Sequence, residues 1–246
     1  MGMIMRVITR VWIVALALAA IAPGQRLALH YLQPAEDWQS QALPIGNGRL
    51  GAMIFGDARR EHLQLNEISL WTGDEKDTGS YQNLGDLWLD LTHGAPQSYQ
   101  RRLDIDTAIH SIEYTADGIA YRREYLASAP QQVLVLSYTA GKPGAYSGTL
   151  KLKDAHAART LAAGSLLTAG GQLANGLRYE TAVQVINSGG RVTASADGAL
   201  HIEKADALTI LVAAGTNYVP DRARRWRGEG PHERIVEQLQ AAAAMP

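Results

Sequence analysis

Short runs of apolar residues, separated by glycine-containing turns, dominate the chain from residue 26 onward. Segments 132–140 and 207–216 are largely apolar, with several Val, Ile and Thr residues, which predicts strands buried on both faces. Segment 179–187 alternates instead, so that Ala182 faces away from Val183. Many short strands without helix–strand alternation indicate a mainly β fold, an antiparallel β-sandwich, and disfavour parallel α/β folds.

Glycine-containing pairs predict where the strands turn. Asp117-Gly118 and Asp197-Gly198 each stand between two strand-like segments. Asp-Gly tolerates positive φ at two successive positions, as a tight hairpin requires. Four further glycine-rich sites predict turns at residues 141–144, 170–171, 175–176 and 189–190.

One helix is predicted, at the C-terminal end of the chain. Pro231 suits the first turn of a helix. Ile235, Val236 and Leu239 then fall on one side of it. The helical pattern is still in progress when the chain reaches Pro246, which favours a helix that begins a linker to a further domain.

Composition narrows the class of protein. Of the 246 residues, 46% are hydrophobic and 19% are charged, which is sufficient for a globular core. The net charge of −1 gives no reason to expect nucleic acid as a partner, and the basic run 222–227 is flanked by acids, as on a solvated surface. The chain has no cysteine and its seven histidines form no metal-binding spacing, so we expect no metal and no cofactor.

The first residues resemble an export signal. Arg6 and Arg10 precede the apolar run 11–22, which is too short for a comfortable membrane span. We therefore expect a signal peptide over residues 1–24 and a mature protein that is periplasmic or secreted in a bacterium. Such a mature protein has no stable membrane association, whereas the alternative is an uncleaved anchor.

The segment "ALPIGNGRLGAMIFG", residues 42–56, combines a strand-like apolar pattern with an unusual centre. Gly46, Asn47 and Gly48 predict a tight turn or bulge, and Arg49 then projects close to that turn. Two interpretations stay open. Arg49 pairs with an acid and pins the loop, or it belongs to a binding surface.

A second unusual cluster follows in "LQLNEISLWTG", residues 63–73. Asn66, Glu67, Trp71 and Thr72 bring together an amide, a carboxylate, an indole and a hydroxyl. A sugar site uses such groups, because an aromatic ring stacks on the apolar sugar face while polar groups bond to its hydroxyls. The same combination also occurs by chance in packed loops.

No catalytic residue can be assigned from these clusters. A glycosidase usually needs two carboxylates that flank the scissile bond, and nothing in the spacing of the nearby acids selects such a pair. No nucleophile elbow and no Ser-His-Asp signature is present either. The acids nearest the unusual loops are Asp57, Glu61, Glu67, Asp74, Glu75 and Asp77.

The segment "PAEDWQSQALPIGNGRLGAMIFGDARREHLQLNEISLWTGDEKD" resembles the amino-terminal signature of glycoside hydrolase family 95, the α-L-fucosidase and α-L-galactosidase family. "LGDLWLDL" (84–91) and "YRREYLASAPQQVLVL" (121–136) continue the resemblance in the same order. It implies an N-terminal β-supersandwich domain over residues 28–220 and the start of a helical linker over residues 221–246. The linker would lead to an (α/α)6 barrel that holds the catalytic residues, so the chain alone would be inactive.

The resemblance also implies partners and roles. The expected partners are an α-linked fucosyl or galactosyl oligosaccharide and the catalytic barrel, in cis or on a partner chain. The two loop clusters would face that barrel and help to close its sugar pocket, or would form a purely structural interface. One alternative is a stand-alone carbohydrate-binding or structural module. Another is the related sandwich of a glycoside phosphorylase, but the sequences of the two loop motifs argue against it.

Overall fold

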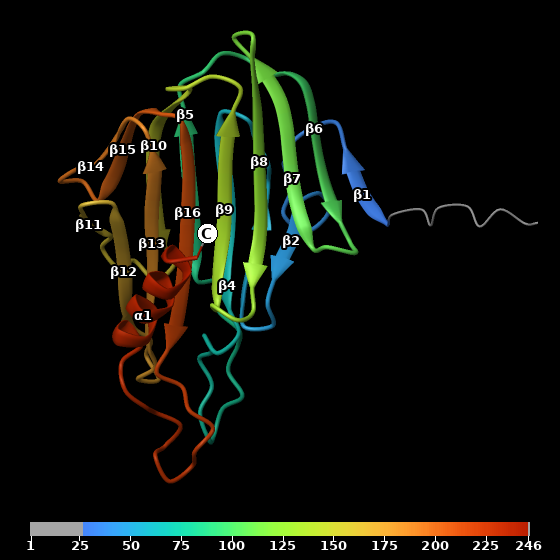
Figure 1. The fold of residues 1–246 in the computed structure, drawn as a ribbon. Coiled ribbons are helices and arrows are strands. Elements are labelled where there is room, and N and C mark those ends of the chain that lie inside the picture. Colours follow the sequence, from blue (N-terminus) through green and yellow to red (C-terminus); the bar gives the residue numbers. More distant parts are fainter. Residues whose placement is uncertain (1–26, 246) are drawn as a thin grey trace, which may run out of the picture.

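The computed structural model describes residues 27–245, so the predicted signal peptide lies outside the described residues. Within residues 27–245 the chain forms two antiparallel β-sheets and one α-helix (Figure 1). This arrangement confirms the mainly β, sandwich-like fold that the apolar pattern predicts. No helix in this part of the chain is long and apolar enough to cross a membrane.

The two sheets contain nine and seven strands. The nine-stranded sheet has the spatial order β1 (Ala28–Tyr31), β6 (Gln97–Asp104), β7 (Ile109–Ala116), β8 (Ile119–Ser128), β9 (Val133–Ala140), β16 (Ala207–Thr216), β13 (Arg178–Ser188), β12 (Leu166–Gln172) and β11 (Leu161–Ala163). The seven-stranded sheet has the order β14 (Arg191–Ala194), β15 (Ala199–Ala205), β10 (Tyr146–Asp154), β5 (Gly85–Leu91), β4 (Arg60–Glu67), β3 (Leu50–Ile54) and β2 (Leu43–Gly46). The chain crosses between the sheets repeatedly, so neither sheet comes from one continuous segment.

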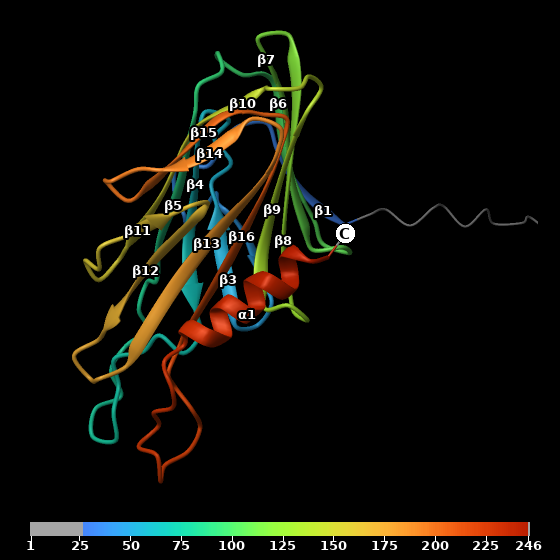
Figure 2. The same ribbon diagram turned by 60° about the vertical axis from the view of Figure 1, so that its left-hand side comes forward.

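The sheets pack face to face and enclose one apolar core (Figure 2). Strand β4 contributes Leu63 and Leu65 from the smaller sheet, while Leu136 and Ile210 come from β9 and β16 of the larger one. Burial alternates along β4 and β5, because successive side chains of a strand point to opposite faces. The alternation leaves the outer face of the smaller sheet polar and its inner face apolar.

The Asp-Gly pairs form hairpins, in two different ways. Asp117 and Gly118 have φ of 51° and 74° and join β7 directly to β8, as predicted. At the second pair only Gly198 has positive φ, 81°. There the N–H of Gly198 bonds to the carbonyl of Ser195 at 3.1 Å, which makes a longer connection between β14 and β15.

The turn predicted at residues 170–171 is wrong, because both glycines lie inside β12 and pair with β13. A Cβ placed on Gly170 would lie 2.6 Å from the carbonyl oxygen of Tyr179. Glycine is therefore required here by a close approach of two strands and not by a change of chain direction.

Helix α1 (His232–Ala243) covers part of the outer face of the nine-stranded sheet (Figure 2). Ile235 and Leu239 are buried against an apolar patch that includes Ala182 and Leu211, which confirms these two positions of the predicted apolar side. Val236, the third predicted position, is only partly buried. Pro231 stands at the N-cap position. The helix ends at Ala243, so the prediction of a helix still in progress at the last residue is wrong.

A buried ion pair joins the two sheets through the core. Arg123 of β8 donates to the Glu61 carboxylate of β4 at 3.1 Å, and neither side chain is exposed to solvent. The same carboxylate accepts from the Tyr125 hydroxyl at 2.6 Å and from the N–H of Gly56 at 2.8 Å. Burial and then the Glu61 charge raise the pKa of Tyr125 well above its usual value, so its hydroxyl stays a donor.

We predict that Glu61→Gln lowers the free energy of unfolding by about 3–5 kcal/mol, because it leaves the Arg123 charge buried without its counter-charge. Urea unfolding followed by circular dichroism measures the change. The matched control is Glu203→Gln, whose carboxylate pairs with Arg191 at the exposed edge of the smaller sheet. That control should change stability by less than about 1 kcal/mol. Equal effects of the two substitutions would show that the buried pair contributes no more to stability than an exposed one.

A buried histidine generates a second prediction, on pH. Burial, and secondarily the Arg101 charge, lowers the pKa of His110 from 6.5 to about 3. The unfolded chain therefore binds more protons than the folded one between these values, and stability falls as pH falls through this window. We expect a loss of about 3 kcal/mol between pH 6.5 and pH 4, measured by urea unfolding, that His110→Leu largely removes. The control His201→Gln, at an exposed position, should leave the pH slope unchanged.

Candidate functional site

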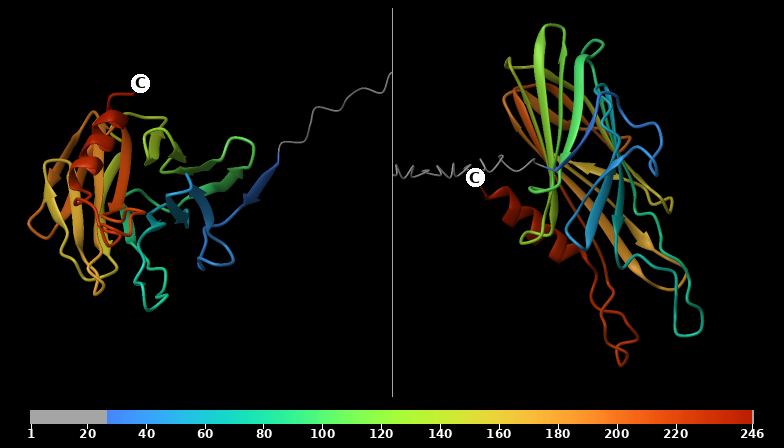
Figure 3. Two further views of the ribbon diagram at one scale, coloured as in Figure 1. Left: turned by 90° about the horizontal axis from the view of Figure 1, so that it is seen from below. Right: turned by 90° about the vertical axis from the view of Figure 1, so that its right-hand side faces the viewer.

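Five connections meet at one end of the sandwich, called the loop end here. The two longest project beyond the sheets, as the cyan and red loops in Figures 1 and 3 show. The loop end consists of residues 47–49, 68–84, 129–132, 173–177 and 217–231. It brings both unusual clusters of the sequence to the same end of the fold.

Asn47 and Gly48 form the tight turn between β2 and β3 that the sequence predicts. Gly48 has φ of 89°, a conformation that glycine adopts without strain. The Asn47 side-chain oxygen accepts from the N–H of Arg49 at 3.0 Å and of Leu50 at 2.9 Å. Its amide nitrogen donates to the carbonyl of Ser128 at 2.9 Å, in the other sheet. Asn47 thus shapes its own turn and also ties it across the sandwich.

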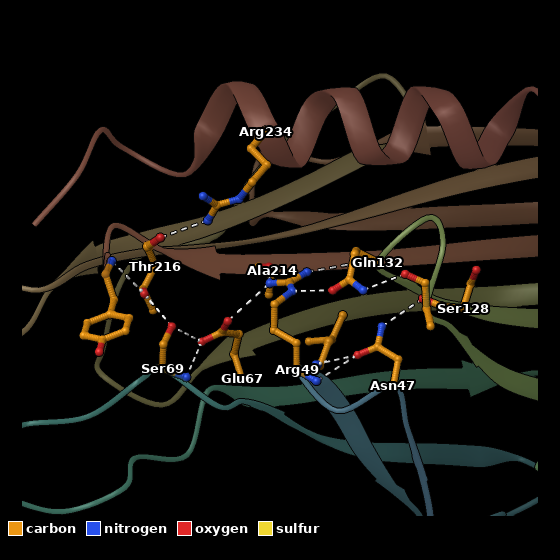
Figure 4. Close-up of polar contacts among 12 residues, drawn as sticks. Asn47, Arg49, Glu67, Ser69, Ser128, Gln132, Ala214, Thr216 and Arg234 are labelled. Carbon is orange, nitrogen blue, oxygen red and sulfur yellow. Dashed lines mark hydrogen bonds and ion pairs between the residues drawn. The ribbon is translucent and has the colours of Figure 1, made fainter. Parts of the chain in front are cut away.

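Arg49 extends from this turn into the gap between the sheets (Figure 4). Its guanidinium donates to the side-chain oxygen of Gln132 at 2.6 Å, to the carbonyl of Ala214 at 2.7 Å and to Glu67 at 3.2 Å. Gln132 directly precedes β9 and Ala214 lies in β16, both of the nine-stranded sheet, whereas Glu67 belongs to the seven-stranded one. Arg49 therefore pairs with an acid and pins the loop, which was the first of its two open interpretations.

Glu67 is buried and has both carboxylate oxygens engaged. Besides Arg49, it accepts from the N–H and the hydroxyl of Ser69 at 2.8 and 2.6 Å. The Ser69 hydroxyl lies 2.6 Å from that of Thr216, and the carbonyl of Thr216 accepts from Arg234 at 2.9 Å. Figure 4 shows this chain of contacts from the β2–β3 turn to helix α1. The carboxylate of Glu67 accordingly fixes the start of the 68–84 loop instead of facing solvent.

The side chain of Asn66 does not lie beside that of Glu67. As neighbours in β4, the two residues point to opposite faces of the sheet. Asn66 lies over Gly51 on the outer face, where a Cβ on Gly51 would come within 3.1 Å of the Asn66 side-chain oxygen. The predicted trio of amide, carboxylate and indole is therefore divided between two faces.

Trp71 and Thr72 lie in the 68–84 loop, which folds back on itself. Trp71 pairs with Tyr81 in an isolated bridge, and Thr72 exchanges hydrogen bonds with Ser80. The indole N–H donates to the carbonyl of Thr78, so it is occupied within the loop. The Trp71 ring remains 40% exposed and lies 6.1 Å from the Tyr81 ring. Burial and then the Glu67 charge raise the pKa of Tyr81.

The sequence pattern did not reveal how the long loops are joined. Asn175 donates to the carbonyls of Trp71 and Gly73, both at 2.9 Å, and its own carbonyl accepts from Arg227 at 3.0 Å. Arg222 pairs with Glu75 at 3.3 Å between the exposed tips of the loops. Asn175-Gly176 is a recognisable turn in the sequence, but the reach of the Asn175 amide depends on the fold.

One exposed acid of the loop end, Asp74, is poorly suited to proton transfer. Asp74 accepts backbone N–H groups from Lys76 and Asp77, which lower its pKa, so this exposed acid stays ionised and is a poor proton donor. The described residues, 27–245, contain no group of three His, Cys, Asp or Glu side chains that could hold a metal ion. Besides charged side chains such as those of Arg222 and Glu75, the loop end exposes three aromatic residues, Trp71, Tyr81 and Tyr218.

Two antiparallel sheets, followed by a helix that packs on the larger one, define the class as a β-sandwich domain. The chain belongs to the family described as glycosyl hydrolase family 65, N-terminal domain, whose model matches residues 29–79 and 74–221. The loop motifs and nearly all strands lie within the match.

The chain is also similar to individual proteins of known sequence or structure. "Alpha-L-fucosidase 2" of Arabidopsis thaliana is 28% identical over 81% of this chain, and "Probable alpha-fucosidase A" of Aspergillus niger is 25% identical over 82%. The match covers 32% of the length of each relative, so the chain spans about a third of them. A structure described as a kojibiose phosphorylase from the human microbiome shares the fold, with a TM-score of 0.50 and 10% identity over 90% of this chain and 36% of that one.

The Arg49 guanidinium makes four hydrogen bonds, the fourth to the carbonyl of Gln132 at 3.2 Å. We predict that Arg49→Lys lowers the free energy of unfolding by about 2–3 kcal/mol, because an ammonium cannot make all four. Hydrogen exchange should accelerate at residues 67–71 more than in β7 and β8. The control is Arg59→Lys, at an exposed position. If the two variants were equally stable, the contacts of Arg49 would not hold the loop end together.

Proposed function

We propose that this chain is the N-terminal, non-catalytic β-sandwich of a family 95 glycoside hydrolase of the inverting α-L-fucosidase type. Two relatives named as fucosidases align with four-fifths of this chain but extend far beyond it, which supports an accessory role. The one carboxylate of the two loop clusters also favours such a role, because Glu67 is fully engaged in structural bonds. Catalysis would then reside in an (α/α)6 barrel.

The loop end is the surface that we propose to meet this barrel and to help close its sugar pocket. The observation that carries the proposal is the rigid mounting of Trp71, an exposed ring on a loop fixed through Glu67, Ser69 and Asn175. An immobilised ring binds a sugar face without a large loss of conformational freedom. The substrate would be an α-linked fucosyl or galactosyl oligosaccharide.

The alternative is a stand-alone carbohydrate-binding or structural module, or one that recruits a barrel on a partner chain. The exposed rings of Trp71, Tyr81 and Tyr218 suit a weak sugar surface as well as a protein interface. Weak sugar binding without hydrolysis would favour the module. We further propose that the protein is exported to the periplasm or beyond, by means of the signal-like residues 1–24.

The mass of the natural protein tests the proposal. An antibody raised against residues 27–245 is applied to cytoplasmic, periplasmic and secreted fractions. We expect a band several-fold heavier than 26.6 kDa in an exported fraction. A band at or slightly below 26.6 kDa would overturn the accessory role and favour the module. Recovery in the cytoplasm alone would overturn the export proposal without affecting the domain assignment.

In the intact hydrolase, we predict that Trp71→Ala lowers kcat/KM for an aryl α-L-fucoside by about tenfold, as expected for loss of one stacking contact of 1–1.5 kcal/mol. The matched control is Trp38→Ala, because Trp38 is 47% exposed but belongs to the β1–β2 connection. Unchanged kinetics with lowered stability would show that the loop end is only a structural interface.

A further inference from the structure

A trough of about 430 Å³ lies on strands β6 to β9, away from the loop end. Its lining includes Arg122, whereas the loop end begins where β8 finishes at Ser128. Six residues of strand separate the two positions, which corresponds to about 20 Å. Helix α1 packs over β9, β13 and β16. It therefore does not cover β6, β7 and the beginning of β8.

An irregularity in β6 shapes one wall of the trough. The pairing of β6 with β7 shifts between Gln97 and Gln100, and Ser98 has φ of 50°. Such a bulge bends its strand and increases the local twist. Ser98 and Gln100 line one side of the trough, and Thr139 of β9 lines the other.

A continuous set of hydrogen bonds orders the polar groups across the trough. His30 lies 3.2 Å from the side-chain oxygen of Gln100, whose amide nitrogen donates to Glu113 at 2.8 Å. Arg122 donates to Glu113 and, at 2.7 Å, to Glu124. All five side chains are at least partly exposed, so the set is held in place and still reaches solvent. Prior ordering reduces the loss of conformational freedom when a ligand binds.

The chemistry of the lining selects a neutral ligand with several hydroxyl groups. Glu113 offers acceptor capacity, while Arg122, Gln100 and Thr139 carry donors, and a sugar hydroxyl can bond to both kinds. One guanidinium between two carboxylates leaves one negative charge in excess, which disfavours an anion. The volume falls within the range of small-molecule sites and suits one or two sugar rings.

We propose that this trough is a saccharide-binding site, separate from the loop end. It would hold a neutral mono- or disaccharide through Glu113, Arg122 and Gln100. The site does not depend on the proposed hydrolase role, because its groups all belong to this chain. It would retain a carbohydrate chain on the sandwich while another part of that carbohydrate is processed.

Backbone-amide NMR of the protein, titrated with methyl α-L-fucoside and with lactose, tests the proposal. We expect shifts confined to residues 98–100, 113–115, 120–122 and 139–141, with a dissociation constant of about 1–10 mM. Shifts confined to residues 68–84 would overturn the proposal and place sugar binding at the loop end. Absence of any shift up to about 50 mM sugar would overturn it as well. Equal shifts with sodium phosphate would overturn the neutral-ligand assignment.

Two substitutions make the test specific. Glu113→Gln removes a charged acceptor with little change of shape and should weaken binding of the better probe about fivefold or more. Thr115→Val removes a hydroxyl that lines the trough, leaves the ion pairs intact and should weaken binding about threefold. The matched control is Glu203→Gln, which breaks another exposed cross-strand Arg–Glu pair, in the other sheet. Equal affinity of all three variants and the unsubstituted protein would overturn the assignment.

Discussion

The ion pair of Glu61 and Arg123 sets the relation between the two sheets. Both charges are buried, so losing the partner of either one would leave an uncompensated charge in the core at a large energetic cost. A shift of β4 by one residue would turn Glu61 to the outer face of its sheet. Arg123 would then remain in the core without a counter-charge. Hydrophobic contacts between the sheets tolerate some sliding, but this pair does not. It therefore helps to specify one register in an interior that is otherwise mostly apolar and aromatic.

At the loop end, too, polar side chains bond across the two sheets, here at the margin of the core. Arg49 reaches from the β2–β3 turn of the smaller sheet to Ala214 of the larger one and to Gln132 in the β8–β9 connection, and Glu67 continues the contacts to Ser69. Because these groups are fixed by bonds to both sheets, the loops that follow them are positioned by the sandwich as a whole. The family membership of the chain and the exposed aromatic residues on these loops are the basis of the proposed accessory role.

Local chemistry made much of the fold predictable. Asp117-Gly118 adopts the two positive φ angles that a tight hairpin requires, and the alternation in 179–187 follows from the geometry of any strand. The glycines at 170–171 were misassigned because a close strand approach and a turn both select glycine. At the site, Arg49 and Glu67 each stood out in the sequence, but their pairing depends on the contact of β3 with β4. The division of Asn66 from Glu67 follows from strand alternation once β4 is recognised, whereas the reach of Asn175 follows only from the fold.

The spatial order of the strands has a consequence for association. The strands at the four sheet margins, β1, β11, β2 and β14, are the shortest in the described part of the chain, with three or four residues each. Strand β2 also carries Pro44, which has no N–H to offer a neighbour. Few unpaired backbone groups are thus available to template another chain, and sheet-to-sheet aggregation is disfavoured. Contacts with other proteins must then form through side chains, which leaves specificity to surfaces such as the loop end.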